Sequence, residues 1–461
     1  MNTMTNDMNG LHDLPEGWVW TTIGECGIVI TGNTPPKNDP SNYGGYLPLV
    51  KPPELTHHII YQAEDGLSEK GAQLARVLPP GSVMVSCIGN LGKTGLNAKP
   101  VAFNQQINAV VLSPEVAPRY VFYYFQTAAA KDYLESVASA TTVAIVNKSK
   151  FQRTPIPLAP LPEQHRIVTE IEKQFTRLDA GVAALKRAQA NLKRYKAAVL
   201  KAACEGKLVA QDSSDEPAAE LLKRILAERR AKWEADLRAK GKDPKKAKYE
   251  EPESLDAEDL PVLPDKWCWT QLGSLFPVTI GGTPSRQKEE YWNGDVPWVS
   301  SGEVRNERIK ATREMITAAG LENSNAKLHK PGIVLLAMIG EGKTRGQAAI
   351  LDIPATTNQN IASILCSETP VSPEWIFYWL MSRYEQTRKS GSGGMQYALN
   401  SERIRGFAFP LPPLAEQRRI VADVERRLSV VQELEGTLAA NLARVERLRQ
   451  SILKRAFEGR L

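Results

Sequence analysis

The stretch Pro410-Leu-Pro-Pro-Leu-Ala-Glu-Gln-Arg-Arg-Ile-Val421 has a close counterpart, Pro157-Leu-Ala-Pro-Leu-Pro-Glu-Gln-His-Arg-Ile-Val168, located 253 residues earlier in the chain. Each stretch leads into a span without proline, Glu163–Glu205 in the first case and Glu416–Glu458 in the second, and a glycine follows each span. Proline stops a helix and glycine commonly ends one. The sequence therefore predicts two long helices, each entered from a proline-rich hinge.

Apolar residues recur in both predicted helices at alternating intervals of four and three, which is the pattern of a coiled-coil seam. Polar Gln189, Lys196, Glu435 and Arg449 complete the pattern. We predict that the two helices pair with each other, antiparallel, because each leads away from one domain toward the other. An amphipathic helix lying on its own domain is the alternative, although more than 40 helical residues would span ~60 Å, longer than a small domain. The predicted seam residues are Ile171, Phe175, Leu178, Val182, Leu185, Leu192 and Val199 in the first helix, and Val424, Leu428, Val431, Leu438, Leu442, Val445 and Ile452 in the second.

The repetition extends over most of the chain. Leu14–Thr21 reappears as Leu263–Thr270, and the matches continue in order with little drift in their offset, which indicates a tandem duplication. Each copy holds short β-rich runs with Gly and Pro between them, so we predict an α+β fold with two globular domains of about 150 residues. The predicted parts are a tail at 1–13, a first domain at 14–160, a helix at 161–208, a linker at 209–262, a second domain at 263–413 and a helix at 414–461.

Several elements can be predicted inside each part. Val83–Ile88, Val110–Leu112 and Ile333–Ile339 are typical of buried strands. Tyr120–Lys131 and Trp375–Tyr384 follow prolines and are predicted helices whose aromatic side chains pack in the core.

The linker has no counterpart after the second copy. It contains a predicted charged helix at 217–240, then a basic patch and an acidic stretch that begins at Glu250. Such charge blocks are usually solvated, so its predicted task is to carry the chain from the first helix to the second domain. Direct contact with nucleic acid remains the alternative.

Composition excludes several classes of protein. The 461 residues are 42% hydrophobic and 24% charged, which is typical of a globular chain. Apolar runs are too short to span a bilayer, and the first residues, MNTMTNDMNG, do not resemble a secretory signal. Five cysteines without a CxxC pair argue against a disulfide framework or a cysteine zinc site and favour a reducing cytoplasm. The net charge of +6 is compatible with a polyanionic partner.

No catalytic motif is found in either copy. A phosphate-binding GxxxxGK[ST] loop would need glycine where Cys87 and Ala337 stand, so the two Gly-Lys-Thr pieces do not predict ATP binding. None of the five histidines recurs in both copies, which argues against a duplicated metal site or general base. We therefore predict a non-enzymatic protein with no metal and no cofactor of its own.

Polar loops supply the candidate DNA contacts. Asn and Gln can bind adenine through two hydrogen bonds, and Arg or Lys can bind guanine. Residues that repeat in both copies are explained equally well as scaffold, whereas positions that diverge, such as Lys51 against Ser300 and Thr56-His57-His58 against Arg305-Asn306-Glu307, are better candidates for reading different bases. The candidates are Thr34, Lys37, Lys51, His57, His58, Lys93, Thr94, Asn104 and Gln105 in the first copy, and Thr283, Arg286, Ser300, Ser301, Arg305, Lys343, Thr344, Arg345, Asn358 and Gln359 in the second.

The layout resembles the specificity subunit of type I restriction–modification systems. The resemblance is carried by two copies of LPxxWxWTxxG, GxTP, GKT and NQ, followed by the PLPPLAEQRRIV-type stretch and a helix that ends in EG(K/R)L. It implies that each domain recognises one half of a split target in double-stranded DNA and that the helices set the spacer between the halves. It also implies two modification (methyltransferase) subunits and restriction (translocase-nuclease) subunits as partners, which would hold S-adenosylmethionine, ATP and Mg.

Two other classes of function remain open at this point. A coiled-coil scaffold could use its duplicated domains to bind protein partners rather than DNA. A stand-alone enzyme could have an unfamiliar site.

Overall fold

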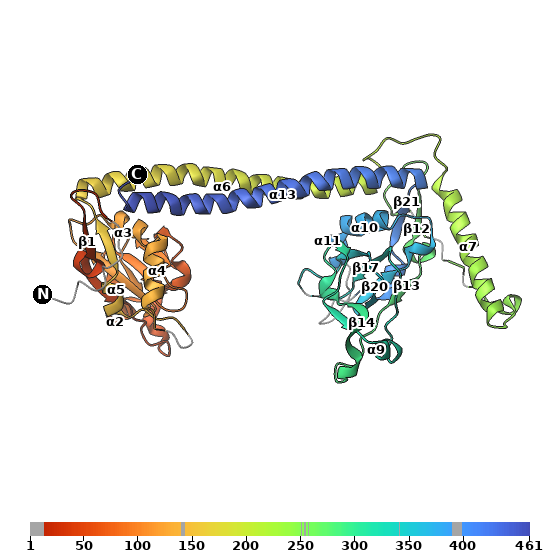
Figure 1. Cartoon of the computed structure of the whole chain (residues 1–461), viewed down its shortest axis with the longest axis horizontal. Coiled ribbons are helices and arrows are strands. Elements are labelled where there is room, and N and C mark those ends of the chain that lie inside the picture. Colours follow the sequence, from red (N-terminus) through yellow and green to blue (C-terminus); the bar gives the residue numbers. More distant parts are fainter. Residues whose placement is uncertain are drawn as a thin grey trace. The chain divides into compact units, whose positions relative to one another are not determined.

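The computed structural model describes residues 13–139, 143–249, 251–252, 255–256, 258–340, 342–389 and 399–461. The predicted tail, apart from Asp13, lies outside the described residues, as does Glu250 of the acidic stretch. The chain divides into two compact units, one made of Met1–Ala188 with Thr437–Leu461 and the other of Gln189–Gly436. Each unit therefore combines one globular domain with a part of each long helix (Figure 1).

The first domain is built on a five-stranded sheet in the order β2-β10-β7-β8-β4. All residues of its strands β7 and β8 are buried, although β8 has the sequence Thr-Gly-Leu-Asn and is not apolar throughout. A four-stranded sheet, β5-β3-β9-β6, forms a second lobe, and a strand pair β1-β11 brings the two ends of the domain together. The bounds are β1 Val19–Thr22, β2 Gly27–Thr31, β3 Tyr43–Val50, β4 His58–Ile60, β5 Asp65–Leu67, β6 Val77–Leu78, β7 Val83–Ser86, β8 Thr94–Asn97, β9 Val101–Phe103, β10 Ile107–Leu112 and β11 Pro155–Leu158.

The helices of this domain correct one prediction. The single helix predicted over Tyr120–Lys131 is two helices, α3 and α4, separated by a turn at Phe125–Thr127. The Thr127 hydroxyl accepts the backbone N–H of Ala130 at 3.1 Å and so caps α4, which a continuous helix would not permit. The bounds are α1 Ile23–Cys26, α2 Glu69–Leu74, α3 Pro118–Tyr124, α4 Ala128–Val137 and α5 Lys148–Gln152.

The second domain has an equivalent arrangement. Its five-stranded sheet has the order β13-β20-β17-β18-β15, its second lobe contains β16-β14-β19, and the strand pair is β12-β21. In both domains the strand at the edge of the large sheet, β4 or β15, runs parallel to its neighbour. The strands are β12 Cys268–Gln271, β13 Val278–Ile280, β14 Trp292–Val299, β15 Glu307–Ile309, β16 Glu314–Ile316, β17 Ile333–Ala337, β18 Ala348–Leu351, β19 Thr356–Thr357, β20 Ile361–Ile364 and β21 Ala408–Leu411.

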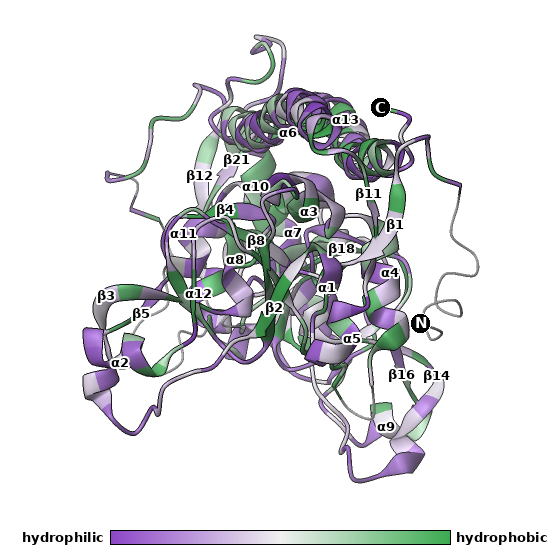
Figure 2. Ribbon diagram, turned by 90° about the vertical axis from the view of Figure 1, so that its left-hand side faces the viewer, coloured by the Kyte–Doolittle hydropathy of each residue, from purple (hydrophilic) through white to green (hydrophobic). Residues whose placement is uncertain are grey.

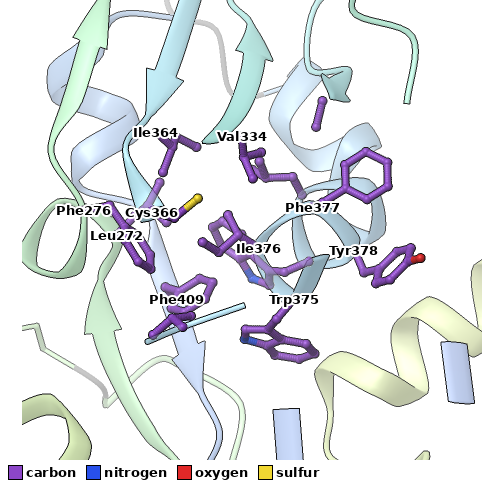
Figure 3. Close-up of a cluster of buried hydrophobic side chains, with 14 of the residues drawn as sticks. Leu272, Phe276, Val334, Ile364, Cys366, Trp375, Ile376, Phe377, Tyr378 and Phe409 are labelled. Atoms are coloured by element: carbon purple, nitrogen blue, oxygen red, sulfur yellow. The ribbon is translucent and has the colours of Figure 1, made fainter. Parts of the chain in front are cut away.

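Aromatic side chains fill the core of the second domain. Trp375, on helix α10, is fully buried and packs edge-on against Trp267 and Phe409 (Figure 3). The indole N–H of Trp375 donates to the carbonyl of Pro410 at 3.2 Å, so the apolar ring is buried without leaving its polar atom unpaired. The helices of this domain are α8 Leu272–Leu275, α9 Ala318–Glu322, α10 Pro373–Ser382, α11 Tyr384–Lys389 and α12 Ser401–Arg405.

Two helices of 44 residues each, α6 (Leu161–Cys204) and α13 (Leu414–Phe457), follow the domains. In the first unit Arg449 of α13 pairs with Asp179 of α6 and lies over the ring of Phe175 at 4.6 Å. In the second unit Arg427 of α13 donates to the hydroxyl of Tyr195 of α6 at 3.3 Å. Early residues of one helix thus contact late residues of the other, which is the pattern of antiparallel neighbours.

The predicted seam residues are all buried or half-buried, whereas Gln189 and Glu435, two of the polar residues that complete the pattern, are exposed. Figure 2 shows α6 and α13 coloured as a mixture of hydrophilic and hydrophobic residues, in contrast to the strongly hydrophobic strand β2. No helix in the described part of the chain is both long and apolar enough to cross a membrane.

Each domain core includes parts of both long helices. The core of the first domain holds Ile171 and Phe175 from α6 together with Phe457 from the end of α13. The core of the second domain holds Val424 from α13 and Leu200 from the end of α6. Each long helix therefore begins on one domain and finishes in the core of the other.

The glycine that follows each long helix likewise packs against the domain of the other half of the chain. A Cβ at Gly206 would lie 2.3 Å from Pro264, and a Cβ at Gly459 would lie 2.2 Å from Pro15. Both glycines have positive φ, so the backbone turns there and packs directly on the start of a domain. The repeated Leu-Pro motif is thus the surface on which the helix from the other half ends.

The linker contains α7 (Ala218–Ala239), close to the helix predicted at 217–240. The linker joins the first helix to the second domain, as predicted, but little of its length is needed for that connection. The N–H of Ala218 donates to the carbonyl of Lys266 at 2.8 Å, so the chain has already reached the second domain before α7 begins. Most of the linker therefore leaves the domain and returns to it.

Candidate nucleic-acid interface

The repeated Gly-Thr-Pro and Asn-Gln motifs meet in the same turn contact in both domains. The Thr34 hydroxyl donates to Oε1 of Gln105 at 2.8 Å, and the Thr283 hydroxyl donates to the matching oxygen of Gln359. The glycine before each threonine is packed so closely that a Cβ at Gly32 would lie 2.2 Å from the carbonyl oxygen of Asn104. These residue types therefore hold two turns together, which explains their repetition without reference to DNA.

The asparagines of this contact are buried. Asn104 and Asn358 are 9% and 7% exposed, and Oδ1 of each accepts a backbone N–H two residues later at 3.1 Å. The interpretation of these amides as exposed loop groups is thus corrected, because each one closes its own turn. The residues that make the turn contact lie closer to the surface than these asparagines; they are Thr34, Gln105, Thr283 and Gln359.

The Gly-Lys-Thr loops also differ from the prediction at one residue. Thr94 is fully buried and its hydroxyl donates to the carbonyl of Gly92 at 3.0 Å, so it is not offered to a ligand. Lys93 is half-buried and lines a cavity of about 490 Å³ with His57 and Lys131.

In the second copy of this loop, Lys343 is exposed and Thr344 is half-buried. The Arg345 guanidinium donates to the carbonyl of Arg388 at 2.8 Å, which ties this loop to α11. The two loops therefore differ in which side chains they leave at the surface.

The divergent positions Lys51 and Ser300 stand at the start of short 3-10 turns. The N–H of Lys51 donates to the carboxylate of Glu54 at 2.5 Å, and that of Ser300 to Glu303 at 2.9 Å. The Lys51 ammonium pairs with Asp65, and Ser301 is half-buried at the first position of its turn. The repeated glutamate thus fixes the turn, while the residue that it caps differs between the domains.

The second divergent loop faces the long helices. In the first unit His57 and His58 line a cavity of about 610 Å³ together with Glu172 of α6 and Glu446 of α13. His57 has a φ of 63°, and the matching Asn306 has a φ of 58°, a conformation that non-glycine residues adopt rarely. Burial lowers the pKa of His57, with a further decrease from neighbouring His58 and an opposing effect of Glu446.

The corresponding cavity of the second unit is larger, about 1130 Å³, and more basic. Arg305 lines it beside Lys193 and Lys196 of α6, and Arg308 on β15 holds its position through ion pairs to Asp352 and Glu374. Arg308 was not singled out from the sequence, because its two carboxylate partners lie 44 and 66 residues away.

Arg286 and its counterpart Lys37 lie near the second lobe of each domain. The Arg286 guanidinium stacks over the ring of Trp292, 3.6 Å from its centroid, and is paired with Glu314. These residues line a pocket of about 350 Å³ with exposed Arg313. Lys37 is exposed. The tryptophan and Arg313 were missed by sequence reasoning, since nothing in their spacing separates them from ordinary loop residues.

The candidate DNA contacts therefore fall into separate groups: the turn contact, the loop beside the long helices and the second lobe.

The cysteines are not part of any of these groups. Burial raises the pKa of Cys87, Cys204 and Cys366 to about 12, which disfavours the reactive thiolate. Among the described residues no group of three or more His, Cys, Asp or Glu is arranged to hold a metal ion.

Two buried glutamines anchor the long helices to their domains. Gln164 accepts the N–H of Ala117 at 2.8 Å and donates to the carbonyl of Ala159 at 2.8 Å. Gln417 accepts the N–H of Ser372 at 3.3 Å and donates to the carbonyl of Pro412 at 2.9 Å. This is the role of the glutamine in the repeated Glu-Gln pair, which the sequence located without explaining.

We expect Gln417→Ala to destabilise the second unit by roughly 3 kcal/mol, because it leaves two buried backbone groups without partners. Calorimetry should then show the melting temperature of that unit reduced by about 6–12 °C. Gln432→Ala, at an exposed position on the same helix, is the matched control and should change it little. Equal melting temperatures for the two variants would contradict the anchoring role.

The comparisons with known proteins agree with this architecture. The family model for the type I restriction modification DNA specificity domain matches the chain twice, over residues 15–191 and 264–442. The chain belongs to this family, whose members are the specificity subunits of type I restriction–modification systems.

Among its relatives, the EcoBI specificity subunit of Escherichia coli is 23% identical over 99% of this chain and 88% of that protein. The HindI specificity subunit of Haemophilus influenzae is 31% identical, over 35% of this chain and 37% of that protein.

Two solved structures share the fold at 20% identity. One is a chain from a type I R-M system, with a TM-score of 0.71, and the other is the HsdS subunit from Thermoanaerobacter tengcongensis, with a TM-score of 0.52. Each comparison covers 98% of this chain and 100% of the other.

Proposed function

We propose that this chain is the DNA-reading subunit of a type I restriction–modification complex, in which each domain recognises one half of a bipartite target. The supporting observation is the double family match together with two domains of equivalent strand order. The side chains that differ between the domains, at the loops of His57 and Arg305 and at Lys37 and Arg286, would give the two half-sites different sequences.

The long helices would set the spacer between the half-sites. A helix of 44 residues is ~66 Å long, a little under two of the ~34 Å turns of DNA, so it is long enough to serve half-sites one to one and a half turns apart. The exposed apolar side chains on these helices, including Tyr195, Leu434 and Leu448, would contribute to docking two modification subunits.

Catalysis would belong to the partners. The modification subunits would hold S-adenosylmethionine, and the restriction subunits would use ATP and Mg to translocate and cleave DNA in the cytoplasm. The present chain would supply recognition and spacing. A protein-binding scaffold is the competing interpretation, and it predicts that no methyltransferase subunit is retained.

Methylome sequencing of a host that carries the complete system tests this proposal. A methylated motif of two short halves and a fixed spacer is expected, and it should disappear when this chain is deleted. In binding titrations we expect weak DNA binding by the isolated chain and tight, specific binding by its complex with modification subunits. Failure of a methyltransferase to co-purify, with no motif lost on deletion, would contradict the proposal.

A further inference from the structure

The linker between the halves makes an excursion that the connection does not require. Besides the bond between Ala218 and Lys266, the Lys266 ammonium donates to the carbonyls of Ser213 and Asp215, each at 2.5 Å. These hydrogen bonds thus join the residues just before the excursion to Lys266, the residue just after it. The 47 residues from 219 to 265 leave this point and return to it, so linking the halves does not explain them.

The base of α7 is fixed on the second domain. Leu221 and Ile225 are buried in the core of that domain. The Arg229 guanidinium donates to the carbonyls of Gly273 and Ser274 at 2.5 and 2.8 Å, and Lys232 pairs with Glu368 at 2.7 Å. The direction of α7, down the outside of the domain in Figure 1, is therefore set by contacts rather than by chance.

The far end of α7 folds back on itself. Gly241, with a φ of 70°, turns the chain after the helix, and a short 3-10 turn follows at Pro244–Lys246. Tyr249 then packs edge-on against Trp233 at 5.1 Å, with Arg230 over the tyrosine ring at 5.5 Å. Residues 237–249, here called the basic tip, thus form a folded end instead of a loose chain.

Charge is concentrated in this part of the chain. Residues 218–249 contain eleven Lys and Arg against five Asp and Glu, a net charge of +6, and the acidic stretch that begins at Glu250 follows them. Within the described part of the molecule Arg238 has an ion pair, to Glu234, and the basic tip holds six exposed cations against one acid, Asp243. The six cations are Arg238, Lys240, Lys242, Lys245, Lys246 and Lys248.

We propose that the basic tip binds the phosphate backbone of duplex DNA beside the target, without regard to base sequence. This inference rests on the proposed function, which brings duplex DNA to the chain. Five of the six cations are lysines, whose ammonium groups act on phosphate as point charges. Contacts of this kind release counterions, so they strengthen binding to all duplexes and make it depend on salt.

The test uses the complex with its modification subunits and the quadruple variant Lys240→Gln, Lys242→Gln, Lys245→Gln and Lys246→Gln. Binding is measured over a range of salt concentrations to two linear duplexes, one with the methylated motif of the system and one without it. We expect the slope of log affinity against log salt to fall by about 2 to 4, roughly one for each phosphate that the variant no longer binds. Affinity should fall by a similar factor for both duplexes, so their ratio stays the same.

The control places Arg at the same four positions, which keeps the charges and should retain the slope. A wild-type complex that does not prefer the motif would contradict the proposed function itself. If the wild type prefers the motif but the Gln variant keeps its slope and affinity, the basic tip does not bind DNA. Loss of a partner subunit from the Gln variant, with DNA binding by the remaining complex unchanged, would assign the tip to a protein partner instead and overturn the inference.

Discussion

Four residues inserted into both long helices, after Ala188 in α6 and after Glu435 in α13, should lengthen the spacer of the methylated motif by one to two base pairs. In each helix the insertion lies between the contacts seen in the two units, Phe175 with Arg449 in the first and Tyr195 with Arg427 in the second. Four helical residues add ~6 Å along the axis, and each base pair of DNA adds ~3.4 Å. Both half-sites should keep their sequences, because the domain cores and loops are untouched.

The number of inserted residues is chosen for the rotation that these residues add to the helix. Four residues turn a helix by ~400°, which leaves a net rotation of about 40° in the same sense as the ~35° per base pair of DNA. A seven-residue insertion would add more length but almost no net rotation, so a domain would meet its half-site in the wrong orientation. We therefore expect the four-residue insertion to be tolerated better than the seven-residue one.

The same four residues inserted after Gly241 form the matched control. Gly241 is exposed at the end of α7, and a Cβ added to it would have no neighbouring atom within 4 Å. That insertion should leave the spacer unchanged, and methylome sequencing reads both variants in the same way. A spacer unchanged by the helix insertions, or a half-site altered by them, would refute the role of the helices as a ruler.

The sequence predicted the parts of the fold that depend on local pattern. Freedom from proline and the terminal glycines placed α6 and α13 within a few residues of their bounds, and apolar runs located β7 and β17. Alternating intervals of four and three identified seam residues that are all buried or half-buried. These features depend on residues near one another in the chain, which is the information that a periodic pattern holds.

Contacts between distant residues were not predictable in this way. Thr94 resembled a loop residue because it follows Gly-Lys, yet it begins β8 in the middle of a sheet. Gln164 bonds to a backbone group 47 residues away, and the excursion of the linker is evident only from the bond between Ala218 and Lys266. Each of these depends on which strands and helices become neighbours, and no spacing rule supplies that.

Replacing residues 263–413 by the corresponding domain of another family member should change one half of the methylated motif and leave the other half unchanged. The large cores of the two domains have no residue in common, so the first domain does not depend on the packing of the second. The spacer should also persist, because α6 and α13 remain as they are. Methylome sequencing of the host measures all three features at once.

The junction determines whether such a chimera folds. Trp267 donates to the buried carboxylate of Glu416 at 2.8 Å, so the incoming domain must carry tryptophan there. Arg229 binds backbone carbonyls, which any sequence provides, whereas the exposed pair of Lys232 and Glu368 can be removed for about 1 kcal/mol or less. Exchange of residues 14–160 is the reciprocal experiment and should change the other half only. A chimera that folds, assembles and still methylates the original motif would show that the second domain does not read DNA.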